Sequence, residues 1–312
     1  MDINELVVVF IAGFLASLVD GALGMGFGPT SSSILLGGGL SPAAVSTTVN
    51  LAKVATGLSG AIAHWRFENI DHRLVGRLAL PGCAGALIGV TVLASVDGDT
   101  LKPVLSCLLL VMAARILLRF SLPLPARAPR QPGRGADGGG DEGGTDQDGA
   151  AEEAALRHYD DRGTAAVAAV GGVTNGLVGA WGPVVTPFLL HRGLTPRFAI
   201  GSVNTAEVAV AVVASGSLLA SIGGGGVDFG IVLAMLAGGV LAAPLAAWVV
   251  RFLPARALGV AVGGLLLFTN LRQLASTAGI GPARWGAYAL VVGVCVLAAL
   301  RPRLRARSPL AT

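Results

Sequence analysis

Two ionisable side chains, Lys53 and Glu207, each lie in the middle of a long apolar segment. An ionisable group near the centre of a bilayer costs about 3 kcal/mol, so it is normally paired or has a function. Each of the two follows an asparagine by three residues, Asn50 and Asn204 respectively. At this depth a lysine can hold the charge of an anion, whereas a glutamate can pair with the lysine or carry a proton. These four residues are therefore candidates for substrate binding, and a static ion pair that joins two parts of the protein is the alternative.

A run of glycines, Gly24-Met25-Gly26-Phe27-Gly28-Pro29, interrupts a further apolar segment. Irregular backbone at membrane depth is tolerated only where protein buries it or where it lines a cavity. We expect the proline to begin a short helix, because its fixed φ suits the first helical position. The free N–H groups of that helix, the hydroxyls of Thr30 and Ser31 and the backbone of Gly26 and Gly28 would then form an anion-binding site.

A second break of the same kind lies at Trp181-Gly182-Pro183, so Gly182 is also a candidate for substrate binding. Asp20 precedes the first break, and with Glu207 it is a candidate for proton coupling. The alternative for Asp20 is a hydrogen bond that holds the broken segment. The alternative for the glycines is close packing of helices.

The segments that carry these residues are predicted to span a membrane. The chain has 312 residues, of which 53% are hydrophobic and only 13% charged, and its mean hydropathy is +0.73. Soluble domains average about 25% charged residues. Apolar runs close to the roughly 20 residues of a spanning helix lie near 4–23, 43–63, 74–96, 101–120, 164–180, 198–222, 229–250, 257–277 and 285–300. We therefore expect an all-α polytopic membrane protein with the lipid bilayer as a partner.

One long polar segment, 121–162, divides the chain. It is rich in Gly, Pro and charged residues, and it lacks the apolar residues of a packed core. We predict a first transmembrane repeat at 1–120, a flexible cytoplasmic linker at 121–162 and a second transmembrane repeat at 163–278. Residues 279–312 are expected to form an extra C-terminal transmembrane helix and a basic cytoplasmic tail.

The two halves contain an internal repeat. A shift of 154 residues aligns Gly28–Ala55 with Gly182–Ala209 without a gap, and 12 of the 28 positions are identical. The same shift pairs Lys53 with Glu207, so two such repeats would bring these side chains face to face near a pseudo-two-fold axis. Substrate sites of secondary transporters lie at the interface between repeats of this kind.

The charges of the loops predict how the halves are oriented. Lys and Arg concentrate on the cytoplasmic side of membrane proteins. Arg-rich loops at 66–77, 121–162, 192–197 and 251–256 and the tail at 301–307 would lie inside, and the acidic loops at 97–99 and 228 outside. This placement requires inverted repeats, each with a broken or re-entrant hairpin and about three transmembrane helices. The N-terminus would then lie outside a cell inner (plasma) membrane, with the linker and C-terminus in the cytoplasm.

Other classes of function find little support. The net charge of +4 reflects arginines that flank apolar runs, so no nucleic-acid partner is expected. The three cysteines show no metal-ligand spacing, and the sequence contains no nucleophile–base set and no phosphate-binding loop. We expect no enzymatic activity, no metal and no cofactor. The oligomeric state is not indicated.

The order of these motifs resembles the sulfite exporter TauE/SafE family of membrane transporters. The resemblance rests on Gly24–Pro29, on Trp181–Pro183, on the loop His64–Asp71 and on Pro81-Gly82. It implies a permease that moves small sulfur-containing or organic anions, such as sulfite and sulfonates, usually outward. One departure is Glu68, which stands where the family pattern has glycine.

We therefore predict a secondary transporter of small anions that works by alternating access between inverted repeats, and its resemblance to the family implies an exporter. One alternative is a permease for a cation or a neutral organic solute, with Glu207 as ligand and Lys53 as its counter-ion. Another is a membrane scaffold that transports nothing. Protons as the coupling ion stay open, since an anion can leave a negatively charged interior without coupling.

Overall fold

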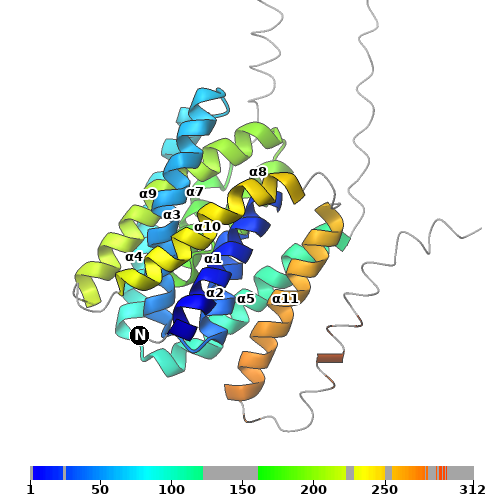
Figure 1. Cartoon of the computed structure of the whole chain (residues 1–312). Coiled ribbons are helices and arrows are strands. Elements are labelled where there is room, and N and C mark those ends of the chain that lie inside the picture. Colours follow the sequence, from blue (N-terminus) through cyan, green and yellow to red (C-terminus); the bar gives the residue numbers. More distant parts are fainter. Residues whose placement is uncertain are drawn as a thin grey trace, which may run out of the picture.

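Ten helices make up the computed structural model of the protein (Figure 1), which describes residues 3–23, 26–121, 161–222, 228–249 and 255–277 with a few isolated positions after them. No strand occurs within these residues. The helices are α1 (Ile3–Leu23), α2 (Phe27–Gly37), α3 (Pro42–Arg66), α4 (His72–Ser95), α5 (Gly98–Ser121), α7 (Thr164–Val178), α8 (Gly182–His191), α9 (Pro196–Ile222), α10 (Phe229–Val249) and α11 (Ala255–Thr277).

The predicted membrane spans are helices wherever the structure describes them, with ends within three residues of the expected ones. Among the described residues, four helices are long and apolar enough to cross a bilayer, at Ile3–Asp20, His72–Ser95, Gly98–Ser121 and Pro196–Ser221. The protein is therefore an all-α polytopic membrane protein, as expected. Gly24, Met25, most of the linker and the predicted C-terminal span lie outside the described residues.

α3 has the length of a spanning helix, but its N-terminal half is polar. That half is buried inside the protein and carries Ser46, Thr47, Thr48, Asn50 and Lys53. A helix surrounded by other helices needs no apolar covering toward lipid, so its hydropathy falls below that of a lipid-facing span. This explains why hydropathy alone marks α3 less strongly than α4 or α5.

Each glycine break separates a helix from a short helix that runs back along it. A Cβ on Gly26 would meet Val19, and a Cβ on Gly38 would meet Val8, so α2 is antiparallel to α1. α8 returns along α7 in the same way, because Val185 lies against Gly171. At 1.5 Å per residue, α2 and α8 are roughly 16 Å long, about half of the 30 Å hydrocarbon core. Both helices are therefore too short to span the membrane, and their N-terminal ends lie inside the membrane-spanning body.

Helices from the two halves cross-pack through glycines. α4 packs on α7, where a Cβ on Gly172 would lie 2.0 Å from the carbonyl oxygen of Gly82. α1 packs on α10, where a Cβ on Gly238 would lie 2.1 Å from that of Phe10. Small residues let helix backbones approach closely, which is the main source of helix association in lipid.

Helices at equivalent positions of the two halves also pair with each other. α3 packs antiparallel on α9, since Gly57 lies near Val208 whereas Gly201 lies near Asn69. α5 packs on α11, where Phe120 covers Gly259 and Leu117 covers Gly263. Equivalent helices of an inverted repeat run in opposite directions, and these two antiparallel pairs agree with the predicted relation of the halves.

Two turns explain local sequence features. Gly39 and Gly193, equivalent in the repeat, both have φ +97°, a region that favours glycine. Glu68, in the α3–α4 turn, has φ 53°, and no other non-glycine residue in the described part of the chain has a positive φ. The residue that departs from the glycine of the family pattern therefore has a backbone conformation that favours glycine.

Substitution of Gly172 by alanine tests the close packing of α4 on α7. The new Cβ would collide with backbone, which cannot move aside like a side chain, so we expect a loss of about 1–3 kcal/mol of stability. The midpoint of thermal unfolding in detergent measures this. Gly216→Ala on α9 is the control, because a Cβ there meets nothing within 4 Å. Equal midpoints for the two variants would contradict the packing.

Candidate functional site

A partly enclosed pocket of about 150 Å³ lies where the two broken hairpins meet α3 and α9. It is lined by Asp20, Gly26, Phe27, Gly28, Pro29, Lys53, Thr56, Gly57, Gly60, Gly179, Gly182, Pro183, Asn204 and Glu207. The N-termini of α2 and α8 both open into it. Seven of the predicted site residues are thus brought together, namely Asp20, Gly26, Gly28, Lys53, Gly182, Asn204 and Glu207.

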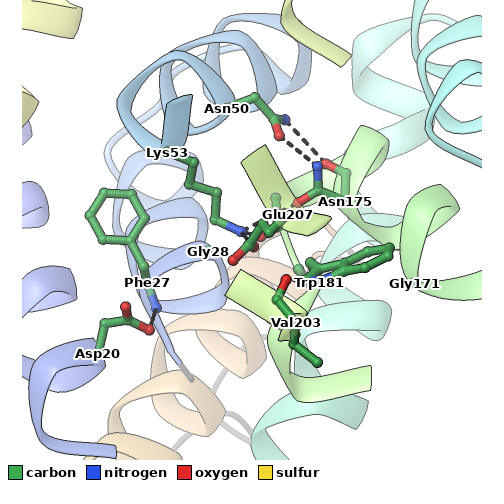
Figure 2. A network of polar contacts seen from close by, with 12 residues as sticks. Asp20, Phe27, Gly28, Asn50, Lys53, Gly171, Asn175, Trp181, Val203 and Glu207 are labelled. Carbon is green, nitrogen blue, oxygen red and sulfur yellow. Dashed lines mark hydrogen bonds and ion pairs between the residues drawn. The ribbon is translucent and has the colours of Figure 1, made fainter. Parts of the chain in front are cut away.

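Lys53 is the centre of the polar contacts around this pocket (Figure 2). Its Nζ donates to a carboxylate oxygen of Glu207, to the carbonyl oxygen of Gly179, and to Oδ1 of Asn175 at 3.3 Å. The Lys53 side chain is only 8% exposed and that of Glu207 18%. The expectation that the two residues face each other is confirmed by this ion pair.

The chain contains only two lysines, Lys53 and Lys102, against 20 arginines. Lys102 pairs with Asp99 at 2.8 Å on the surface. Lysine carries a compact ammonium with three donors, whereas arginine carries a larger planar group. Three acceptors, two from the end of α7 and one from α9, surround the ammonium of Lys53, and this arrangement suits a point charge.

Asn175, near the end of α7, belongs to the site although the sequence reading missed it. Its Nδ2 donates to Oδ1 of Asn50 at 2.7 Å, and Nδ2 of Asn50 donates to the Asn175 carbonyl oxygen at 3.2 Å. These reciprocal bonds join α3 to α7 and hold the Asn175 amide oxygen near Lys53. The signal in the sequence was an amide side chain inside the otherwise apolar run 164–180.

Asn50 therefore does not line the pocket, although its repeat partner Asn204 does. Besides the bonds to Asn175, Nδ2 of Asn50 contacts the carbonyl oxygen of Ser46 at 2.9 Å. Asn50 positions the neighbours of Lys53 and does not face the cavity.

The predicted hydroxyls are also used differently. Ser31 donates to the carbonyl oxygen of Phe27 at 2.6 Å, and neither Ser31 nor Thr30 lines the pocket. Thr30 is fully buried, and its Oγ1 has no hydrogen-bond partner among the described residues. α2 begins at Phe27, so Pro29 is its third residue and does not open the helix as expected. Its missing N–H costs nothing there, since the first four N–H groups of a helix have no intrahelical partner.

Asp20 holds the first break and also faces the pocket. Its Oδ1 accepts the N–H of Phe27 at 3.3 Å, at the start of α2. At the equivalent place in the other half, Oγ1 of Thr174 donates to the carbonyl oxygen of Ala180 at 2.5 Å. Both breaks are closed by a polar side chain, but only the first carries an ionisable group.

The two breaks touch each other at glycines. A Cβ on Gly28 would lie 1.8 Å from the carbonyl oxygen of Gly179, the same oxygen that accepts from Lys53. Gly179 has φ +66° and ends α7. Both positions therefore require glycine, one for the close approach and one for the backbone conformation.

Trp181 anchors the second break to the neighbouring helices. Its ring is fully buried between Gly82 and Gly171, and its Nε1 donates to the carbonyl oxygen of Val203 at 3.1 Å. The N-terminus of α8 is thereby tied to α4, α7 and α9.

The arrangement suits binding of a small charged solute more than catalysis. Two helix N-termini and one ammonium supply positive potential, and two carboxylates supply negative charge, within one cavity. In the described part of the chain no group of three or more His, Cys, Asp or Glu residues has a geometry that would hold a metal ion.

The energetic coupling between Lys53 and Glu207 can be measured by a double-mutant cycle. Loss of one partner of a buried pair costs roughly 3–5 kcal/mol because the other charge stays uncompensated. We expect Lys53→Met or Glu207→Gln alone to lower the thermal midpoint in detergent more than the combined variant does. Additive effects in the double variant would show that the two side chains are not coupled.

Comparison with known proteins identifies the family of the chain. The model of the sulfite exporter TauE/SafE family matches residues 9–273. The chain is 35% identical over 272 residues to the probable membrane transporter protein YtnM of Bacillus subtilis (strain 168). The aligned residues make up 87% of this chain and 83% of that protein. No solved structure matches this chain significantly. The chain is therefore a multi-pass membrane protein that belongs to the sulfite exporter TauE/SafE family of membrane transporters.

Proposed function

We propose that the protein is a secondary transporter that binds a small anion, such as sulfite or a short sulfonate, at Lys53 between the N-termini of α2 and α8. The observation that carries the proposal is the convergence of these three positive groups on one pocket. Helix N-termini favour anions through their free N–H groups and the helix dipole. Lys53 adds a full charge at the same place.

The unpartnered hydroxyl of Thr30 adds support at the first helix. Buried polar atoms are almost always hydrogen-bonded, so an exception needs an explanation. Thr30 lies in the first turn of α2, and its Oγ1 would be 4.0 Å from a Cβ on Gly26, a pocket residue. An anion or its water at the mouth of α2 would give this hydroxyl a partner.

The volume of the pocket limits the size of the substrate. About 150 Å³ is the size of a cavity that holds a benzene-sized molecule. Sulfite, methanesulfonate and acetate fit this volume, whereas a sulfonate with a long chain does not.

Alternating access between the two halves is the proposed mechanism. The antiparallel pairs α3–α9 and α5–α11 support inverted repeats, and the pocket lies between the halves, as in other transporters of this design. Lys53 and Glu207 come from opposite halves, so their ion pair closes the site from both sides. We further propose a plasma-membrane location with the N-terminus outside and the linker and C-terminus in the cytoplasm, from the positions of the arginines.

A second candidate follows from the two carboxylates of the pocket. Asp20 and Glu207 together outweigh Lys53, and this favours a cation or a solute with an amino group. A scaffold without transport has no observation in its favour. A panel of sulfite, methanesulfonate, acetate and taurine in proteoliposomes, together with an organic cation, separates the three functions.

Replacement of Lys53 tests the proposal directly. Lys53→Met in the Glu207→Gln background removes the ammonium without changing the net charge of the pocket, so we expect flux of sulfite or methanesulfonate to fall at least tenfold. Lys102→Met is the matched control, because it removes the other lysine of the chain from the surface. Undiminished anion flux in the double variant would overturn the anion site. Faster flux of the organic cation would favour the second candidate.

A larger residue at Gly60 tests the size limit. Gly60 lines the pocket, and a Cβ there meets nothing within 4 Å, so the new side chain would occupy cavity space without a clash. We expect Gly60→Val to slow methanesulfonate severalfold more than sulfite, as measured by competition in proteoliposomes. Gly216→Val, on the exposed side of α9, provides the control for a valine in a helix. An equal loss for both anions would contradict a size limit at this position.

A further inference from the structure

We infer, on the basis of the proposed anion transport, that each monoanion bound at Lys53 is accompanied by one proton taken up by Glu207, so that transport of a monoanion is electroneutral. The inference rests on three observations: Lys53 is already bonded to Glu207, a second carboxylate faces the same cavity, and no other cation lines it.

The charges of the pocket come from three residues on three helices. Asp20 on α1 and Glu207 on α9 oppose Lys53 on α3. With all three ionised the pocket carries one net negative charge, and a bound monoanion would raise this to two. Uncompensated charge in a site of low dielectric is costly, and a carboxylic group there takes up a proton instead. Uptake of one proton with each anion keeps the net charge of the pocket constant.

Glu207 is the carboxylate that an incoming anion displaces. The ammonium of Lys53 has three acceptors: Glu207, the carbonyl oxygen of Gly179 and Oδ1 of Asn175. The two neutral acceptors belong to the end of α7 and need not leave. An anion that takes the ammonium therefore replaces the one negative partner, and Glu207 loses its counter-ion.

Asp20 makes an ionised and unpaired Glu207 still less favourable. It lies in the same pocket, and its bond from the Phe27 N–H at the start of α2 keeps it there. Asp20 can keep this bond while Glu207 changes, because the two carboxylates have separate hydrogen-bond donors. Glu207, left without its counter-ion beside a second carboxylate, is thus the group that takes up the proton.

Other titratable groups lie on the helices packed around the pair, and none of them lines the pocket. On α1, α3, α4, α5, α8, α9 and α11 these groups, among the residues whose side chains are described, are Glu5, His64, Arg66, His72, Arg73, Arg77, Cys83, Asp99, Lys102, Cys107, Arg115, Arg119, His191, Arg197 and Arg272. α2, α7 and the described side chains of α10 contribute no ionisable residue.

Proton uptake can be counted in the wild-type protein in detergent. Methanesulfonate is the probe, because it stays a monoanion over the whole pH range in which a protein is stable. Titration calorimetry in buffers of different ionisation enthalpy gives the protons bound per anion, and we expect about one. The apparent Kd should then rise about tenfold per pH unit where Glu207 is ionised before binding.

Two variants assign the proton. Glu207→Gln should still bind methanesulfonate but without proton uptake and with a Kd independent of pH, whereas Asp20→Asn should keep the uptake. In proteoliposomes an imposed membrane potential should leave methanesulfonate flux through the wild type unchanged. Anion binding without proton uptake overturns this inference and leaves the anion site standing. No binding of any anion by the folded wild type overturns the proposed function itself.

Discussion

The ammonium of Lys53 is the group around which the rest of the structure is arranged. It contacts a carboxylate from the opposite half, an amide oxygen and the last carbonyl of the α7 break. A buried charge is tolerated only with such partners. The positions of α3, α7 and α9 are therefore coupled through one atom, and a solute that competes for that atom acts on all three helices at once.

Glycines make this arrangement possible. Backbone meets backbone where Gly28 faces Gly179, and again along α4 and α7. Any side chain at Gly28 would separate the two breaks and move the Gly179 carbonyl away from Lys53. Close packing and a cavity were alternatives for the glycines of the breaks, and Gly28 combines both, because it lines the pocket and meets the backbone of Gly179.

The sequence predicted the helices and the central pair because those features repeat. A shift of 154 residues placed Lys53 opposite Glu207, and the ion pair joins these two residues. The partners of single residues could not be predicted in this way. Asn175 has Gly21 at its equivalent position, so the repeat gave no hint of its bonds to Asn50. Ser31 was expected at the pocket, but its hydroxyl bonds its own helix, as serine hydroxyls commonly do.

The asymmetry of the halves is as informative as their likeness. Thr174 and Asp20 hold equivalent breaks, yet only Asp20 adds a charge. Asn270 donates to Ser33 at 2.7 Å and ties α11 to α2, whereas the equivalent residues, Ile116 and Pro187, are apolar. A perfectly symmetric pair of halves would give the inward-open and outward-open states equal energies. The polar bond between α11 and α2 has no polar equivalent between α5 and α8, so in the proposed alternating-access mechanism it would favour one of the two states.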